Sequence, residues 1–178
     1  MKYFSKITGE RLYLSPINVE DAELYTKWLN DPAVAVPLGQ YWKLISLANE
    51  KKALEELTSE GHNYAIILKD GDQLIGNMGL FDIDHLSRSA TLGLFIGDEE
   101  NRGKGYGTEA IRLLLGFGFN TLNLHNVMLH CDSDNLQGIA CYNKVGFREF
   151  GRRRSCTFKN GRYIDKVHMD ILSTEFEL

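Results

Sequence analysis

A glycine-rich segment, Glu100 to Thr108, constrains this chain more than any other stretch. The apolar run 92–96 before it is typical of a buried strand, and the run 111–119 after it repeats apolar residues at helical spacing. The sequence therefore predicts a strand, a tight loop and a helix in direct succession. Within the loop, Gly103, Gly105 and Gly107 stand at alternate positions, where the absence of a Cβ lets the backbone approach a ligand closely.

The same segment favours an anion as the ligand. The free N–H groups of a loop and of the following first helical turn form a concave set of donors, and the helix dipole favours negative charge there. Arg102 and Lys104 add positive charge on both sides of Gly103. We interpret the loop as a phosphate or pyrophosphate site, with an ordinary glycine-rich turn as the alternative.

Three phosphate-binding patterns can be compared with this loop. A P-loop needs Ser or Thr after its lysine, but Lys104 is followed by Gly105. A dinucleotide fingerprint beginning at Gly103 needs glycine where the chain has Thr108. The third pattern, Arg-x-x-Gly-x-Gly, is met by Arg102, Gly105 and Gly107, and here the chain resembles the coenzyme A pyrophosphate loop of the GCN5-related N-acetyltransferases.

Composition limits the remaining choices. The length of 178 residues predicts one domain, 1–178, and we expect a cytoplasmic protein because the sequence shows neither a signal peptide nor a membrane-spanning run. Three cysteines in no C-x-x-C pair predict reduced thiols and no metal site. A net charge of −4 disfavours nucleic acid as a partner and suits a cationic acceptor. We interpret the basic cluster Arg148 with 152–154 as a solvated strand edge.

Periodicity along the chain predicts an α/β fold with one mixed sheet. Asn18 is a plausible helix cap, and Pro32 ends the helix that follows it. Strand 90–96 should be parallel to strand 126–131, because a helix connects them. Asn-Gly at 160–161 predicts a hairpin. The expected order is β-α-α-β-β-β-α-β-α-β-β, with strands at 10–16, 64–68, 73–81, 90–96, 126–131, 147–158 and 163–172. The expected helices are one capped at Asn18 that runs to 29, and others at 46–58, 111–119 and 135–144.

A second block strengthens the resemblance. Asn135 precedes Tyr142 by seven residues, or two helical turns, so that both lie on one helix face. The block ends with Gly146-Phe147 and resembles the second conserved block of the same family. The segments 28–32, 97–110 and 163–172 are similar to the branch that includes the ribosomal-protein N-terminal acetyltransferases. The resemblance covers nearly the whole chain and implies the family's acyl-CoA N-acyltransferase fold.

The resemblance also implies a site. Acetyl-CoA would be the acetyl donor, Tyr142 the general acid for the departing thiolate, and the Ile96 backbone the contact for the thioester oxygen. Gly97 would suit a bulge at the end of that strand. The implied cofactor-binding residues are Phe95, Ile96, Gly97, Arg102, Gly103, Lys104, Gly105, Tyr106, Gly107, Thr108, Asn135, Tyr142 and Lys144.

The resemblance does not identify a single general base in this chain. Relatives often carry glutamate where this chain has Thr91, which cannot act as a base at neutral pH. Asp82, Asp84 and His85 in the polar loop 82–89, His130, and a water relay remain open, and His130 has the suitable pKa class. The cysteines occupy no nucleophile setting, which favours direct transfer over a covalent intermediate.

Several alternatives stay open at this point. A coenzyme A sensor that has lost activity would also explain Thr91. A longer acyl group, or a nucleotide held in the same loop, fits the glycine pattern as well. The acceptor could be a protein N-terminus, a polyamine or another small amine, and a homodimer is compatible with the sequence. No membrane partner is expected.

Overall fold

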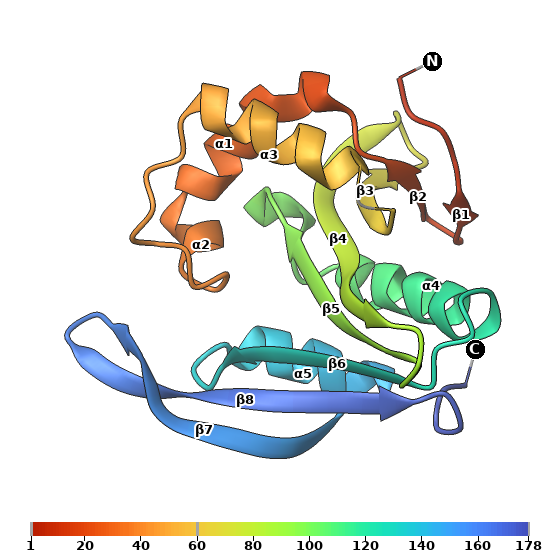
Figure 1. The fold of residues 1–178 in the computed structure, drawn as a ribbon. Coiled ribbons are helices and arrows are strands. Elements are labelled where there is room, and N and C mark those ends of the chain that lie inside the picture. The colour runs from red at the N-terminus through yellow and green to blue at the C-terminus, as the bar shows by residue number, and fades with distance from the viewer. Residues whose placement is uncertain (1, 60, 178) are drawn as a thin grey trace.

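The computed structural model describes residues 2–59 and 61–177, and these form one eight-stranded mixed sheet with helices on both faces (Figure 1). The strands are β1 Ile7–Thr8, β2 Leu12–Pro16, β3 Asn63–Leu68, β4 Gln73–Asp84, β5 Ser89–Ile96, β6 Asn126–Asp132, β7 Arg148–Lys159 and β8 Arg162–Leu172. The helices are α1 Ala22–Asn30, α2 Pro32–Ala35, α3 Leu47–Ser59, α4 Tyr106–Asn120 and α5 Leu136–Val145, with single 3₁₀ turns at Val19–Asp21 and Glu99–Asn101.

Strand order confirms the predicted mixed sheet. The strands run β1-β2-β3-β4-β5-β6-β8-β7, and β5 and β6 are parallel neighbours joined through α4, while the other neighbours are antiparallel. The predicted order is present, with β1, α2 and the two 3₁₀ turns added to it. These additions are too short to produce a periodic signal. Pro32 does end α1, as expected, but it also begins α2, where Asp31 accepts from the Ala33 N–H.

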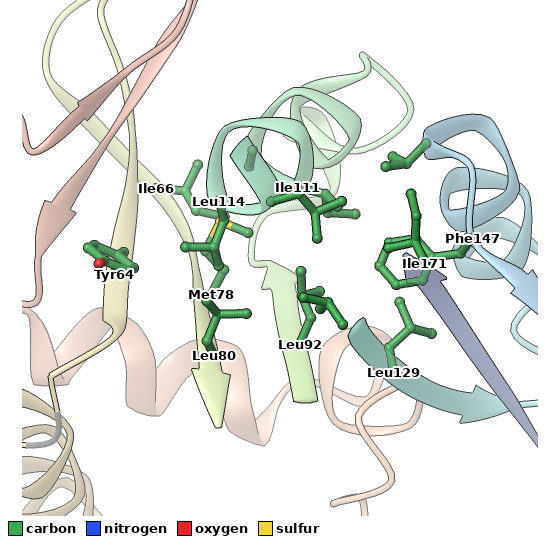
Figure 2. Close-up of a cluster of buried hydrophobic side chains, with 14 of the residues drawn as sticks. Tyr64, Ile66, Met78, Leu80, Leu92, Ile111, Leu114, Leu129, Phe147 and Ile171 are labelled. Atoms are coloured by element: carbon green, nitrogen blue, oxygen red, sulfur yellow. The ribbon is translucent and has the colours of Figure 1, made fainter. Parts of the chain in front are cut away.

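The larger core lies between the sheet and helix α4. Ile111 and Leu114 of α4 are fully buried against Met78 of β4 and Leu92 of β5 (Figure 2). Ile111 and Leu114 are three residues apart, so both lie on the helix face that packs against the sheet. The same cluster extends over β6 and β8 to the residues that precede and follow α5, including Phe147.

A second core covers only part of the opposite face. Tyr25 and Trp28 of α1 and Leu54 of α3 pack on Ile67 of β3 and Leu74 of β4. Among the described residues, this second cluster contains none from β6, β8 or β7. We call the face of β6, β8 and β7 that this second core does not reach the uncovered face, although the Tyr41 hydroxyl donates to the Phe158 carbonyl of β7.

The segment 82–89, expected to be a polar loop, is shorter than predicted. Strand β4 continues to Asp84 and β5 begins at Ser89, with a register shift between Phe81 and Asp84. Asp84 accepts hydrogen bonds from the Leu86 and Ser87 main-chain N–H groups and from the Ser87 hydroxyl. These bonds, the one from the hydroxyl first, hold the pKa of Asp84 below its ordinary value.

Gly97 does not form the expected bulge. The β4–β5 register is regular at Gly76 opposite Ile96, and the Gly97 N–H continues the ladder by donating to the Ile75 carbonyl at 2.9 Å. Glycine is needed for a different reason: a Cβ at this position would lie 2.1 Å from the Trp28 ring. Trp28 in turn contacts Phe95 edge to face at 6.1 Å between ring centroids, which fixes α1 over the end of β5.

No helix in the described ranges is both long and apolar enough to cross a membrane.

Replacing Gly97 by alanine should lower the free energy of unfolding by about 1–3 kcal/mol, because the added methyl overpacks the Trp28 ring. Urea unfolding would measure this loss. Gly61→Ala is the control, since a Cβ there meets no atom within 4 Å. In a Trp28→Leu background the Gly97→Ala cost should shrink, and an undiminished cost would show that the ring is not responsible.

Candidate functional site

The central feature of the site is that β5 and β6 separate partway along their length. Their parallel ladder contains Ser89–Thr91 opposite Asn126–Met128 and no later pair. Beyond it, β5 stays paired with β4 as far as Gly76 opposite Ile96, and β6 stays paired with β8 as far as Asp132 opposite Lys166. Figure 1 shows the two strands close together at one end and apart at the end that leads to the glycine loop.

This separation leaves backbone groups of β5 without a strand partner. Because Gly97 donates to β4, the alternation of an antiparallel ladder directs the main-chain groups of Leu94 and Ile96 the other way, toward β6. The Ile96 carbonyl accepts from the Arg102 side chain, so the Leu94 N–H and C=O and the Ile96 N–H are the groups left for a ligand. At that depth β6 no longer pairs with β5. An extended ligand between the two strands could therefore take the hydrogen bonds that a strand would otherwise make.

The glycine loop ends at the open end of this separation. Gly103 and Gly105 have φ of 71° and 83°, a region that favours glycine, and Gly105 immediately precedes α4. The first turn of α4 begins with Tyr106, Gly107 and Thr108, whose N–H groups have no intrahelical acceptor. The loop therefore presents main-chain donors and the positive end of a helix dipole, as predicted for an anion site.

Arg102 does not supply charge to the loop in the way the sequence suggested. Its guanidinium donates to the carbonyl oxygens of Ile96 at 3.2 Å, of Gly97, and of Ala33 at 3.2 Å. Its main-chain N–H is also taken, by the Glu99 carbonyl. Arg102 therefore ties the end of β5 to α2. Lys104, which is exposed, is left as the cation beside the amides at the start of α4.

Arg11, which sequence reasoning did not single out, holds the loop from the other side. Its Nη1 donates to the Lys104 carbonyl at 2.9 Å, and its Nε and main-chain N donate to the two carboxylate oxygens of Glu109, each at 2.8 Å. The guanidinium also lies over the Tyr106 ring, 4.8 Å from its centroid. The one local signal for this arrangement is the acidic Glu109 in the first turn of α4.

Helix α5 places Tyr142 beside the loop. Asn135 caps α5 as predicted by accepting from the Gly138 N–H at 3.0 Å, and Gly146, with φ of 117°, ends it. The Thr108 hydroxyl lies 3.3 Å from the Cys141 sulfur, so the residue next to Tyr142 contacts the start of α4. The Tyr142 ring is half-buried against the larger core and contacts Phe147 at 6.1 Å between centroids. Lys144 is exposed on the same helix.

Tyr142 is a proton donor over the whole neutral range. Burial, followed by the nearby Cys131 and Cys141, raises the pKa of its hydroxyl above the ordinary value of 10. Burial likewise raises the pKa of the Cys131 thiol to about 11, so this cysteine stays protonated and is a poor nucleophile.

His130 lies on the other face of the sheet. Its neighbours Leu129 and Cys131 point into the larger core with Tyr142, so His130 projects from the uncovered face. Its ring lies 5.7 Å from that of His168, the residue opposite it on β8. Partial desolvation lowers the pKa of His130, and Lys166 and His168 lower it further, against a smaller opposite effect of Asp132.

The other candidate bases lie far from Ile96. Asp82, Asp84 and His85 are at or near the turn that joins β4 to β5, and Ile96 is at the opposite end of β5, roughly 20 Å away at the usual rise of a strand. The Phe95 side chain packs against Tyr25 and Trp28, so this residue can meet a ligand through its backbone rather than its ring.

The Arg11–Glu109 interaction should be measurable as a pH-dependent stability. Burial alone would raise the pKa of Glu109, but the hydrogen bonds and charge of Arg11 bring it below the ordinary 4.5. A carboxylate whose pKa is lower in the folded than in the unfolded protein stabilises the fold at any pH above its unfolded pKa. That stability is lost as the pH falls through its pKa in the folded protein. Glu109→Gln should therefore cost about 1 kcal/mol at pH 7, since the partial exposure of Arg11 weakens the pair.

Urea unfolding of both proteins from pH 7 down to pH 3 measures this term. The difference in the free energy of unfolding between the original protein and the Glu109→Gln variant should narrow as the pH falls. A difference that stays constant with pH would mean that the Glu109 charge does not hold the loop.

Comparison with known proteins agrees with this arrangement. The family model described as an acetyltransferase (GNAT) domain matches residues 11–148. An N-acetyltransferase named p20 from Bacillus licheniformis is 29% identical over 94% of this chain and 96% of its own length. A putative ribosomal N-acetyltransferase, YdaF, of Bacillus subtilis is 33% identical over 62% of this chain and 60% of its own.

One solved structure is similar over nearly the whole length. The spermidine N-acetyltransferase of Vibrio cholerae, crystallised with CoA and spermine, superposes with a TM-score of 0.82 at 25% identity, covering 94% of this chain and 98% of that one. The separated strands, the glycine loop and the family match lead to one conclusion: this chain belongs to the GNAT acetyltransferase family.

Proposed function

We propose that this protein transfers an acetyl group from acetyl-CoA to a primary amine by direct attack. The observation that carries the proposal is the separation of β5 from β6 next to the free amides at the start of α4. A pantetheine arm needs an extended channel with backbone partners, and a pyrophosphate needs a cluster of donors. The two features meet at the end of β5. The similar Vibrio cholerae enzyme was crystallised with CoA, which supports the same donor here.

The residues present fit such a donor. The amides from Gly103 to Thr108 would hold the pyrophosphate, with Lys104 beside them. The backbone of Leu94 would pair with the amide groups of the arm, and the Ile96 N–H would donate to the thioester oxygen as negative charge develops there. Arg11 and Arg102 position the loop and the strand end and need not touch the donor.

The transfer balances with two proton movements. The amine lone pair forms the new C–N bond at the thioester carbonyl carbon, and the C–S bond breaks. Tyr142 donates its proton to the departing sulfur and recovers one from solvent. His130, directly or through water, accepts the proton that the nitrogen loses. The two side chains lie on opposite faces of the sheet, so the amine could arrive from one face while the thiol is protonated from the other.

The direct test is to mix purified protein with acetyl-CoA and a panel of amines and to follow free thiol and acetylated product. Transfer to at least one amine is expected. Stabilisation by CoA with no transfer to any amine would identify a coenzyme A sensor instead. Thermal stabilisation by ATP but not by CoA would show that the loop holds a nucleotide phosphate.

Tyr142→Phe should lower kcat by about 10²–10⁴-fold, because the departing thiolate loses its proton donor. The KM for acetyl-CoA should change little, since the ring and its contact with Phe147 are retained. Steady-state kinetics with acetyl-CoA varied at saturating amine would measure both constants. Equal turnover in the two proteins would remove Tyr142 from the chemistry.

The pH dependence of kcat tests His130. Because the pKa of His130 lies below the ordinary 6.5, the base form should predominate at pH 6.5, and the fall of kcat in acid should have its midpoint below that pH. Lys166→Met should move this acidic limb to higher pH, since Lys166 lowers the His130 pKa. His130→Gln should remove the limb. A limb that is the same in His130→Gln would assign it to another group.

A further inference from the structure

The uncovered face of β6, β8 and β7 lies beside the separated strands. On β8, Val167 and Met169 point into the larger core, so Lys166 and His168 project from the other face. There His168 lies opposite His130 of β6, and the exposed Phe150 ring of β7 contacts His168 at 6.1 Å between centroids. A ligand on this face would therefore lie directly beside His130.

This face belongs to a strongly basic hairpin. Between residues 148 and 172 the chain has seven basic and three acidic residues, although the whole protein has a net charge of −4. The basic residues are Arg148, Arg152, Arg153, Arg154, Lys159, Arg162 and Lys166. The overall acidic balance, which suggested a cationic acceptor, is thus reversed next to the site.

Some of these charges are neutralised and others are free. Lys159 is buried and paired with Asp132 at 3.3 Å and Asp134 at 2.6 Å, and Arg152 pairs with Glu149 at 3.1 Å. In the described part of the chain, Arg153, Arg154 and Lys166 have no carboxylate within salt-bridge distance.

The free charges lie within a few residues of the site. Arg153 is opposite Lys166 in the β7–β8 register, and Lys166 is opposite Asp132 in the β6–β8 register. Two of the free cations therefore lie in one row across the sheet, which ends at the Asp132 carboxylate that Lys159 neutralises. Two strand spacings, about 10 Å, separate β7 from β6, and the open gap between β5 and β6 adds to this, so a peptide with its α-amine at Ile96 needs about four extended residues and their side chains to reach the row. In Figure 1 the hairpin continues past the end of β6.

From this row of free charge we propose that the acceptor is the α-amino group of a polypeptide with acidic residues near its N-terminus. The α-amine would reach the Ile96 end of β5, and carboxylates at its third and fourth positions would meet Lys166 and Arg153, with the exposed Arg154 adding positive charge at the next position of β7. This substrate class rests on the proposed acetyl transfer.

The choice of an α-amine also accounts for Thr91. An α-amino group has a pKa of about 7.7–8.0, so roughly a tenth of it is neutral at pH 7, whereas a lysine-type amine with a pKa near 10.4 is almost wholly protonated. A weak base then suffices, and no carboxylate is needed at the position of Thr91. A polyamine, by contrast, would meet unpaired positive charge on this face.

The test compares four acceptors in low salt: the peptides Ser-Asp-Asp-Asp, Ser-Asn-Asn-Asn and Ser-Lys-Lys-Lys, and spermidine. The value of kcat/KM should be about tenfold or more higher for the acidic peptide than for the neutral one, and lowest for the basic peptide and spermidine. Added NaCl should reduce the advantage of the acidic peptide. Equal use of spermidine and the acidic peptide would overturn the proposal and leave acetyl transfer intact.

Charge reversal sharpens the result. Arg153→Glu with Arg154→Glu should abolish the preference for the acidic peptide and favour the basic one. The matched control is Lys51→Glu with Lys52→Glu, an adjacent exposed pair on α3 with the same change in charge. An unchanged preference in the Arg153/Arg154 variant, or the same loss in the control, would refute the assignment.

A binding measurement separates this inference from the proposed function. Fluorescence anisotropy of a labelled, N-acetylated acidic peptide needs no turnover. Binding that the Arg153/Arg154 variant loses supports the peptide surface even if no amine is acetylated. Acetylation of amines together with no binding of this peptide would refute the surface alone.

Discussion

The incomplete pairing of two parallel strands is the constraint on which the rest of this structure depends. Strands β5 and β6 share three residue pairs and then separate, each held by its other neighbour. A continuous ladder would satisfy Leu94 and Ile96 internally and leave no position for an extended ligand. The separation is supported from both sides, since Trp28 covers Gly97 on one face and the Thr108–Cys141 contact joins α4 to α5 on the other.

The glycine loop is similarly held in place by side-chain hydrogen bonds. Arg11 from the start of β2 and Arg102 from within the loop segment together donate to the carbonyls of Lys104, Ile96, Gly97 and Ala33. Each guanidinium satisfies main-chain carbonyl oxygens that would otherwise lie unpaired near a bound anion. A loop arranged in this way loses little conformational entropy when it binds a phosphate.

The sequence predicted those features that local rules determine. The strand, glycine loop and helix, the Asn135 cap, the Gly146 terminus and the parallel pairing across α4 all follow from periodicity and turn chemistry, and each is present. Arg11 could not be predicted because its partner Glu109 is 98 residues away, a contact that only the folded chain creates. The prediction of a bulge at Gly97 was wrong, because glycine is required there by the Trp28 ring of α1, which is also distant in sequence. The sequence assigned the Arg102 guanidinium to the ligand, whereas in the structure it donates hydrogen bonds to nearby main-chain carbonyls.

The most direct measurement of the central claim is a crystal structure of the complex with acetyl-CoA. The account predicts pyrophosphate oxygens on the amides from Gly103 to Thr108 and the pantetheine arm between β5 and β6, hydrogen-bonded to Leu94 and Ile96, with the sulfur near the Tyr142 hydroxyl. The account would be contradicted if β6 closed onto β5 with the donor bound elsewhere, or if Tyr142 lay far from the sulfur.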